Sequence, residues 1–166
     1  MTGDQNSEQS RIALDVQRLI TSQQTLLLAT CSPEGEPEIS YAPFVRDERG
    51  SFYIFISELA KHTRHLRHNP KASLLFIEPE AGCRNLYARA RVVFNCAARC
   101  IAPESESYQH HLDALENKFG DTVALLRSLP DFHLFELTPE TGQYIAGFGK
   151  AYTINLKENR ISHTGG

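Results

Sequence analysis

Apolar and polar residues alternate along most of this chain in the pattern of β-strands. Runs with strand periodicity or continuous apolar character occupy residues 25–30, 38–45, 51–56, 71–78, 84–96, 132–137 and 143–156. Polar turns at 32–37 and 46–50, which contain Gly35 and Gly50, join the first three of these runs. We therefore predict an antiparallel meander at the start of the sheet.

Helical spacing occurs in four shorter segments between the strands. Apolar residues follow the i, i+3, i+4 rule within 10–20, and helices are also predicted at 61–68, 103–119 and 122–129. The second helix ends before Asn69-Pro70, because proline cannot continue a helix. Strands joined by tight turns, with a few helices, predict a mainly β (α+β) fold: a small antiparallel β-barrel with helices on its outside.

The length of 166 residues fits a single domain. We place the barrel domain at 10–156, after a flexible N-terminus at 1–9 and before a weakly ordered C-terminal tail at 157–166. The formal net charge of -3 argues against broad nucleic-acid binding. No apolar run reaches the roughly 20 residues that cross a bilayer, so we expect no membrane insertion. The polar first ten residues lack a secretory pattern, which predicts a cytoplasmic protein.

The predicted helix at 61–68 concentrates basic side chains. It carries Lys61, His62, Arg64, His65, Arg67 and His68. No acidic residue lies between Glu58 and the end of this helix. A strand that leads into the first turn of a cationic helix suits an anionic group, because free N–H donors and positive charges meet there. Lys61, His62 and Arg64 are the candidates for phosphate or carboxylate contacts, so flavin mononucleotide (FMN) and haem both qualify as ligands. A solvated basic helix face remains the alternative.

Two further segments carry candidate ligand contacts. Arg89 and Arg91 share one face of the predicted strand 84–96, where guanidinium groups can grip a carboxylate or form ion pairs at an interface. Phe148 lies between two glycines and can pack on a flat ring, or simply anchor the turn. Lys150 follows this kink and can close a cleft from a partner subunit.

The order of these elements resembles the flavin-binding split-barrel superfamily, whose type member is pyridoxamine 5′-phosphate oxidase. The resemblance rests on residues 27–30, the Gly35 turn, 52–55 and 66–75. The chain most resembles the haem-utilisation (HugZ/HutZ-type) branch, on the motifs Ser57-Glu-Leu-Ala-Lys-His-Thr63, Ala88-Arg-Ala-Arg91 and Gly147-Phe-Gly-Lys-Ala-Tyr152. The resemblance covers about residues 10 to 163.

This resemblance implies a homodimeric split barrel with its ligand in a cleft between subunits. It implies haem (iron protoporphyrin IX) as the cofactor, with a histidine near the C-terminus as axial iron ligand. By position that metal ligand is His163, although family tails are often longer and richer in histidine. His65 also departs from the asparagine expected there. Asp131 is the candidate catalytic residue that orients the imidazole, or it begins a loop.

The predicted function is haem binding in haem utilisation, either oxidative degradation that releases iron or intracellular storage and transfer. Whether the chain is an enzyme stays open, as do the regiochemistry of ring opening and the identity of the external electron donor. The alternative is an FMN-dependent oxidoreductase of the pyridoxamine-phosphate-oxidase type, which would use the same basic helix for the flavin phosphate.

Overall fold

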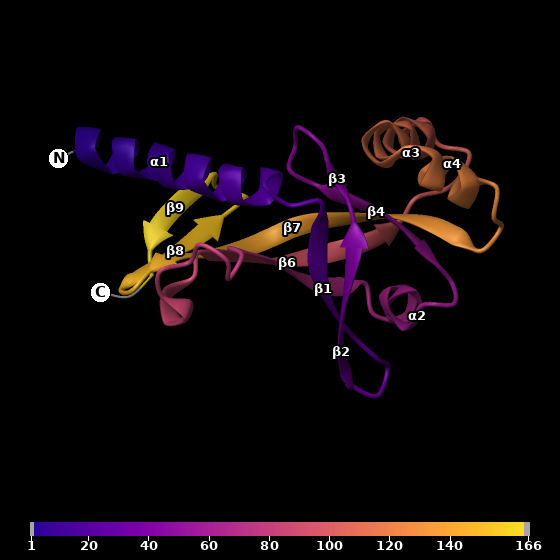
Figure 1. The fold of residues 1–166 in the computed structure, drawn as a ribbon, viewed down its shortest axis with the longest axis horizontal. Coiled ribbons are helices and arrows are strands. Elements are labelled where there is room, and N and C mark those ends of the chain that lie inside the picture. The colour runs from indigo at the N-terminus through magenta and orange to yellow at the C-terminus, as the bar shows by residue number, and fades with distance from the viewer. Residues whose placement is uncertain (1, 165–166) are drawn as a thin grey trace.

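The computed structural model describes residues 2–164, and its centre is an antiparallel sheet that curls on itself (Figure 1). The nine strands of the described chain run β2-β1-β5-β6-β7-β4-β3, and β8 and β9 extend the sheet from β7. Their bounds are β1 (Thr25–Cys31), β2 (Pro37–Pro43), β3 (Val45–Arg46), β4 (Phe52–Ser57), β5 (Lys71–Ile77), β6 (Arg91–Cys100), β7 (Phe132–Gly147), β8 (Lys150–Asn155) and β9 (Arg160–His163).

The long strand β7 joins the two halves of the sheet. Its first residues pair with β4, from Phe132 opposite Ser57 to Leu137 opposite Phe52. Its last residues pair with β8, from Thr141 opposite Asn155 to Gly147 opposite Lys150. A bulge near Asn95 and Cys96 of β6 separates the two registers along β7. The strand can therefore bend and serve both lobes, because a bulge increases local twist.

Helices cover the two ends of this sheet. They are α1 (Thr2–Thr21), α2 (Lys61–His68), the short 3-10 helix η1 (Leu86–Ala88), α3 (Glu106–Phe119) and α4 (Asp121–Arg127). Figure 1 shows α1 beside β8 and β9, at the opposite end of the molecule from α3 and α4. The Ser105 side chain accepts a hydrogen bond from the Tyr108 amide, which caps the first turn of α3. No described helix has both the length and the apolar character that a membrane crossing requires.

Two apolar clusters hold these layers together. The larger one fills the barrel with aromatic rings from β4, β5, β6, β7 and β8, and it receives one face of α1, namely Ile12, Val16 and Ile20. The smaller one lies under α3 and α4 and includes Val45, Tyr53, Leu112, Leu115 and Leu134. At 0% exposure Phe52 belongs to the first cluster, whereas its neighbour Tyr53 faces the second. The alternation of β4 therefore serves one core on each of its faces.

The predicted mainly β, antiparallel fold with outer helices is confirmed, but the strand predicted at 84–96 is wrong in its first half. Residues 86–88 form η1, and β6 begins only at Arg91. Local polar contacts explain the difference. The Asn85 side chain caps η1 by accepting from the Tyr87 amide, and the Arg89 guanidinium donates to the Glu78 carbonyl oxygen at 2.8 Å. Arg89 and Arg91 therefore do not share one strand face.

Regular elements extend into both segments that were predicted to flank the barrel domain. Helix α1 begins at Thr2, and β9 lies inside the segment expected to be a tail. Contacts between distant residues account for both elements. The Tyr152 hydroxyl donates to Glu8 Oε1 at 3.1 Å, and Tyr152 in β8 pairs with His163 in β9. Met1 and residues 165–166, which also belong to those predicted segments, lie outside the described chain.

Candidate cofactor site

The basic helix α2 is held to the barrel by its few non-basic residues. Thr63 and Leu66 are buried, and the Thr63 hydroxyl donates to the Ser57 carbonyl oxygen at 2.6 Å. The Asn69 amide donates to the His65 carbonyl oxygen and closes the last turn. Because Thr63 and Leu66 point inward, the charged side chains at the other helical positions are directed toward the solvent side.

Several cations of α2 have acidic or polar partners from other elements. Lys61 Nζ lies 3.6 Å from Glu38 Oε2 of β2, and Arg67 lies 2.8 Å from Glu58 Oε1. His65 Nδ1 lies 3.1 Å from the Thr30 hydroxyl. Among the described residues, no ion pair engages Arg64, so its guanidinium is available for an anion. The helix sequence contains no acidic residue, so the pairing of Lys61 with Glu38 could not be predicted from it.

His62 occupies the half-buried side of the same helix. Burial lowers the pKa of His62, a shift that Glu38 opposes and His65 reinforces. The neutral imidazole is therefore favoured around pH 7, because a buried site disfavours the charged form. A neutral His62 can accept or donate one hydrogen bond, but it adds little positive charge for a phosphate or carboxylate.

Asp131 lies beside α2, at the point where β4 ends and β7 begins. Its Oδ2 accepts a hydrogen bond from the Ser57 hydroxyl at 2.7 Å, and its carbonyl oxygen accepts from the Glu58 amide at 2.8 Å. Next to it, Glu58 Oε1 contacts both Arg67 and His133 Nε2 at 2.8 Å. Lys61, His62, Arg64 and Asp131 thus form one neighbourhood, which we call the α2 group.

The remaining predicted site residues lie at the other end of the sheet. Arg91 of β6 pairs with Ile145 of β7, and Lys150 pairs with Gly147 across the hairpin whose tip exposes 70% of Phe148. We call Arg89, Arg91, Phe148, Lys150 and His163 the sheet-end group. Within it, Arg89 already holds the Glu78 carbonyl oxygen and lies 3.3 Å from Glu80 Oε1. Its guanidinium therefore stabilises this loop rather than standing free for a carboxylate.

His163, the predicted iron ligand, is an exposed residue of β9. Its ring meets the Tyr152 ring edge-on, with centroids 5.1 Å apart. It lines a pocket of about 400 Å³ together with Glu8, Ile12 and Arg160. Glu8 is a residue that sequence reasoning missed, because it lies in the segment expected to be flexible.

One chain does not bring the two groups together. Strand β5 begins at Lys71, three residues after α2, and ends at Ile77, which pairs with Arg91. The six residue steps between these ends span about 20 Å. Asp131 precedes Phe132, whereas His163 pairs through Tyr152 with Tyr144, twelve residues further along β7. That length of strand is up to about 40 Å. Figure 1 shows β9 at the opposite end of β7 from α2, so Asp131 is too far from the His163 imidazole of the same chain to orient it.

Exposed apolar residues of β1 and β2 lie next to one another on the outer face of the sheet. Tyr41 and Ile39 are 65% and 71% exposed, and Tyr41 lies opposite Leu27, which is 37% exposed. Leu27 in turn pairs with Leu75 of β5. A row of neighbouring apolar side chains on one sheet face is typical of interaction surfaces rather than of scattered exposed residues.

Comparison with known proteins places this architecture. The family model described as pyridoxamine 5′-phosphate oxidase matches residues 14–146. The chain belongs to the pyridoxamine 5′-phosphate oxidase family. The match runs from α1 to the end of β7 and therefore includes α2 and the Arg91 strand, and the predicted resemblance is confirmed.

Within the pyridoxamine 5′-phosphate oxidase family, the chain belongs with HutZ. It is 36% identical over 147 residues to the heme oxygenase HutZ of Vibrio cholerae, covering 89% of this chain and 83% of the relative. A crystal structure of Vibrio cholerae HutZ, there described as a heme storage protein, matches with a TM-score of 0.71 over 76% of this chain and 88% of that one. Campylobacter jejuni ChuZ matches at 30% identity with a TM-score of 0.82, over 94% of this chain and 63% of ChuZ.

Proposed function

We propose that this chain binds haem at a site made by two copies, in which the α2 group of one protomer faces the sheet-end group of its partner. The observation that carries this proposal is the separation of the two groups within one chain. Asp131 and His163 lie at opposite ends of β7, so residues suited to one haem meet only if a second chain supplies half of them. The 36% identity to HutZ, which is named a heme oxygenase, supports haem as the ligand.

A two-fold axis is the simplest way to form such a homodimer. An isologous contact uses the same surface on both subunits. The apolar row of Leu27, Ile39, Tyr41 and Leu75 offers that surface. If the axis crosses the strands of this face, each α2 lies opposite the Arg91 end of the partner sheet. Two equivalent sites then form in each dimer.

The residues available fit the needs of a haem. Lys61 and Arg64 can hold the propionates, because cationic donors bind carboxylates through charge-assisted hydrogen bonds. His163 can ligate iron through a neutral imidazole nitrogen, and the partner's Asp131 can accept the proton on its other nitrogen. Arg91, Phe148 and Lys150 can border the macrocycle. In the degradation version of this function, the bound haem would supply the oxygen chemistry and an external donor would supply the electrons.

Haem degradation and haem storage remain two versions of this function, since HutZ itself is named both a heme oxygenase and a heme storage protein. Incubating the haem complex with ascorbate under oxygen separates them. Release of iron with a biliverdin-like product supports an enzyme. An unchanged complex after many hours supports a carrier.

A haemin titration tests the ligand assignment. We expect a sharp Soret band with the wild type, and a weaker, shifted band with His163→Ala. The matched control is His110→Ala, because His110 is an exposed histidine of α3 at the far end of the molecule. Equal spectra for both variants would remove His163 as the ligand. Sedimentation at micromolar concentration tests the homodimer, and Tyr41→Glu should shift it toward monomer.

A flavin enzyme is the second candidate, favoured by the family match itself. In that case Arg64 and Lys61 would hold the phosphate of FMN. A yellow protein with flavin absorbance after purification supports it, whereas a colourless protein that leaves the spectrum of added FMN unchanged argues against it.

A further inference from the structure

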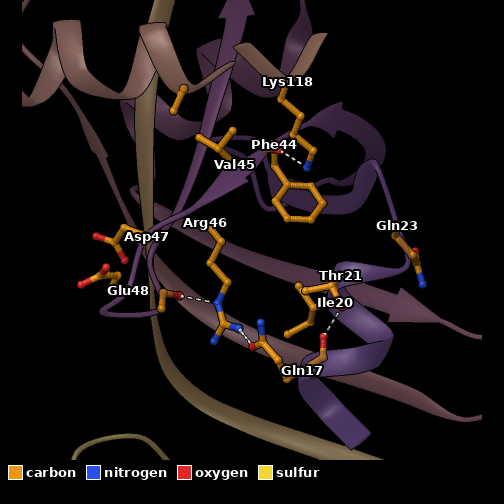
Figure 2. Close-up of a pocket in the computed structure, with 12 residues that line it drawn as sticks. Gln17, Ile20, Thr21, Gln23, Phe44, Val45, Arg46, Asp47, Glu48 and Lys118 are labelled. Atoms are coloured by element: carbon orange, nitrogen blue, oxygen red, sulfur yellow. Dashed lines mark hydrogen bonds between the residues drawn. The ribbon is translucent and has the colours of Figure 1, made fainter. Parts of the chain in front are cut away.

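A cavity of about 550 Å³ lies between the C-terminal end of α1, β3 and α3 (Figure 2). None of the α2 group or the sheet-end group lines it. Its volume falls in the range of small-molecule sites, which is about 300–1,000 Å³. The cavity is therefore separate from the proposed haem site.

The cavity wall carries two cations that are held by neutral groups. Arg46 is half-buried; its Nη1 donates to Gln17 Oε1 at 2.6 Å, and its guanidinium carbon lies 5.2 Å from the centre of the Phe52 ring. Lys118 is more exposed, and its Nζ donates to the Phe44 carbonyl oxygen at 2.8 Å. Among residues 2–164, neither side chain takes part in an ion pair.

The nearest acidic residue compensates only part of this charge. Asp47 lines the same cavity, but its carboxylate accepts from the Ser51 amide at 2.9 Å and the Tyr53 hydroxyl at 3.2 Å, and lies 3.6 Å from Arg49. Burial lowers the pKa of both Arg46 and Lys118, and the negative charge of Asp47 opposes this shift at Arg46 without cancelling it. An anion that entered the cavity would relieve this cost.

The remaining lining is mixed: Thr21, Gln23 and the exposed Glu48 are polar, and four residues are apolar. Ile20, Phe44 and Val45 are buried core residues that reach the cavity wall, and Ala114 of α3 completes it. Figure 2 shows the Phe44 ring below Lys118, and Ile20 across from the Arg46 guanidinium. A ligand with an apolar body therefore has a surface to cover next to each cation, whereas an inorganic ion alone would leave most of the volume unfilled.

We propose that this cavity binds a small organic anion, a carboxylate or a phosphate monoester attached to an apolar group, with Arg46 as its main anchor. The anion accepts hydrogen bonds from the Arg46 guanidinium, either in place of Gln17 Oε1 or beside it. This is possible because a guanidinium has five N–H donors and the protein uses only some of them. Lys118 adds a second positive charge, and Phe44 and Ile20 contact the apolar part.

Benzoate, phenyl phosphate and neutral benzamide test this proposal by calorimetry on the full chain. Binding of benzoate alone identifies a carboxylate site, and binding of phenyl phosphate alone identifies a phosphate site. Benzamide should bind at least tenfold more weakly than the better anion. Arg46→Gln should weaken that anion by roughly 10- to 100-fold, the value of a hydrogen bond to a charged group. Arg18→Gln is the matched control, because Arg18 is on α1 next to Gln17 but 79% exposed.

Two outcomes would overturn the proposal. One is that neither anion binds wild type with a Kd below roughly 10 mM. The other is equal affinity of wild type and Arg46→Gln. If Arg46→Gln fails to fold, Arg46→Lys keeps the charge but loses the fork, and amide NMR of the wild type locates the bound probe. Shifts that avoid Arg46, Gly50 and Lys118 would also refute it. The haemin spectrum of Arg46→Gln should match that of wild type, so a failure here leaves the haem proposal untouched.

Discussion

Two positively charged regions of this chain differ in how the fold treats their charge. The α2 cations are numerous and conspicuous in the sequence, yet Lys61 and Arg67 are paired with Glu38 and Glu58. Arg46 and Lys118 lie far apart in the sequence, yet both line one cavity. Their hydrogen-bond partners are neutral amide and carbonyl oxygens. Whether a basic side chain lacks an acidic partner therefore depends on its neighbours in the folded structure, and not on how many basic residues surround it in the sequence.

The same comparison holds for what anchors each region. Helix α2 depends on Thr63 and Leu66, while its cations stay on the surface. Arg46 has a structural role of its own, since its side chain connects the turn before β4 to α1. Four changes or measurements can break or sharpen this contrast.

The largest effect is expected for Leu66→Ala. Leu66 is 2% exposed and belongs to the main core cluster, so its truncation should lower the free energy of unfolding by about 2–5 kcal/mol. Urea unfolding followed by circular dichroism measures this loss. A change below about 1 kcal/mol would mean that the surface charges, and not the apolar side of the helix, hold α2 in place.

A smaller effect is expected at Lys118 when the cavity is filled. The pKa of Lys118 is lowered by burial, so in the free protein its neutral fraction is raised at alkaline pH. Bound benzoate or phenyl phosphate should raise that pKa by about one unit, as an opposite charge nearby does. Competitive acetylation across pH, read by mass spectrometry, measures the shift. An unchanged pKa at saturating anion would place the anion elsewhere.

Stability near α2 should depend on pH through His62. Its pKa is lowered below 6.5 by burial, so the unfolded chain binds this proton more tightly than the folded chain does. The unfolding free energy therefore rises as pH increases toward 6.5, and it falls as the pH drops through the folded-state pKa. In His62→Gln this part of the slope should disappear. Unfolding midpoints between pH 5 and 7 would reveal it, and an identical slope in the variant would contradict it.

The smallest effect is expected for Lys61→Met. The Lys61 side chain is 67% exposed and lies 3.6 Å from Glu38, so the ion pair should contribute only about 0–1 kcal/mol to stability. Unfolding midpoints at low and high salt would show a slight difference that salt removes. In the same variant haem affinity should fall clearly if Lys61 contacts a propionate. A large loss of stability would mean that the pair has a structural role after all.

The sequence predicts much of the fold because short apolar runs between polar turns mark the strands. Strands β1, β4 and β5 carry patterns that their buried residues confirm, such as Leu26 and Leu28 inward in β1. The late start of β6 depends instead on Glu78, which takes the Arg89 guanidinium and the Ala90 amide from eleven and twelve residues away. Strand β9 exists through its pairing with β8, so its own four residues hardly reveal it.

The candidate site is less predictable for the same reason. Residue types indicated the α2 cations, but not that Asp131 is bonded to Ser57 or that Glu38 contacts Lys61. The cavity at Arg46 was missed because its lining comes from α1, β3 and α3, and no local pattern joins these segments. Side chains that meet only after the chain folds leave no periodic signal.

The pairing of β7, β8 and β9 also decides how the C-terminal segment should be studied. Cutting the chain after Gly147 would strip the hydrogen-bonding partner from residues 141–147 of β7 and leave a bare sheet margin. Such margins recruit other chains and promote aggregation. A shortened protein that loses its colour with haemin would then report damage to the sheet as readily as the loss of an imidazole, so single side-chain replacements are the sound way to examine this end of the molecule.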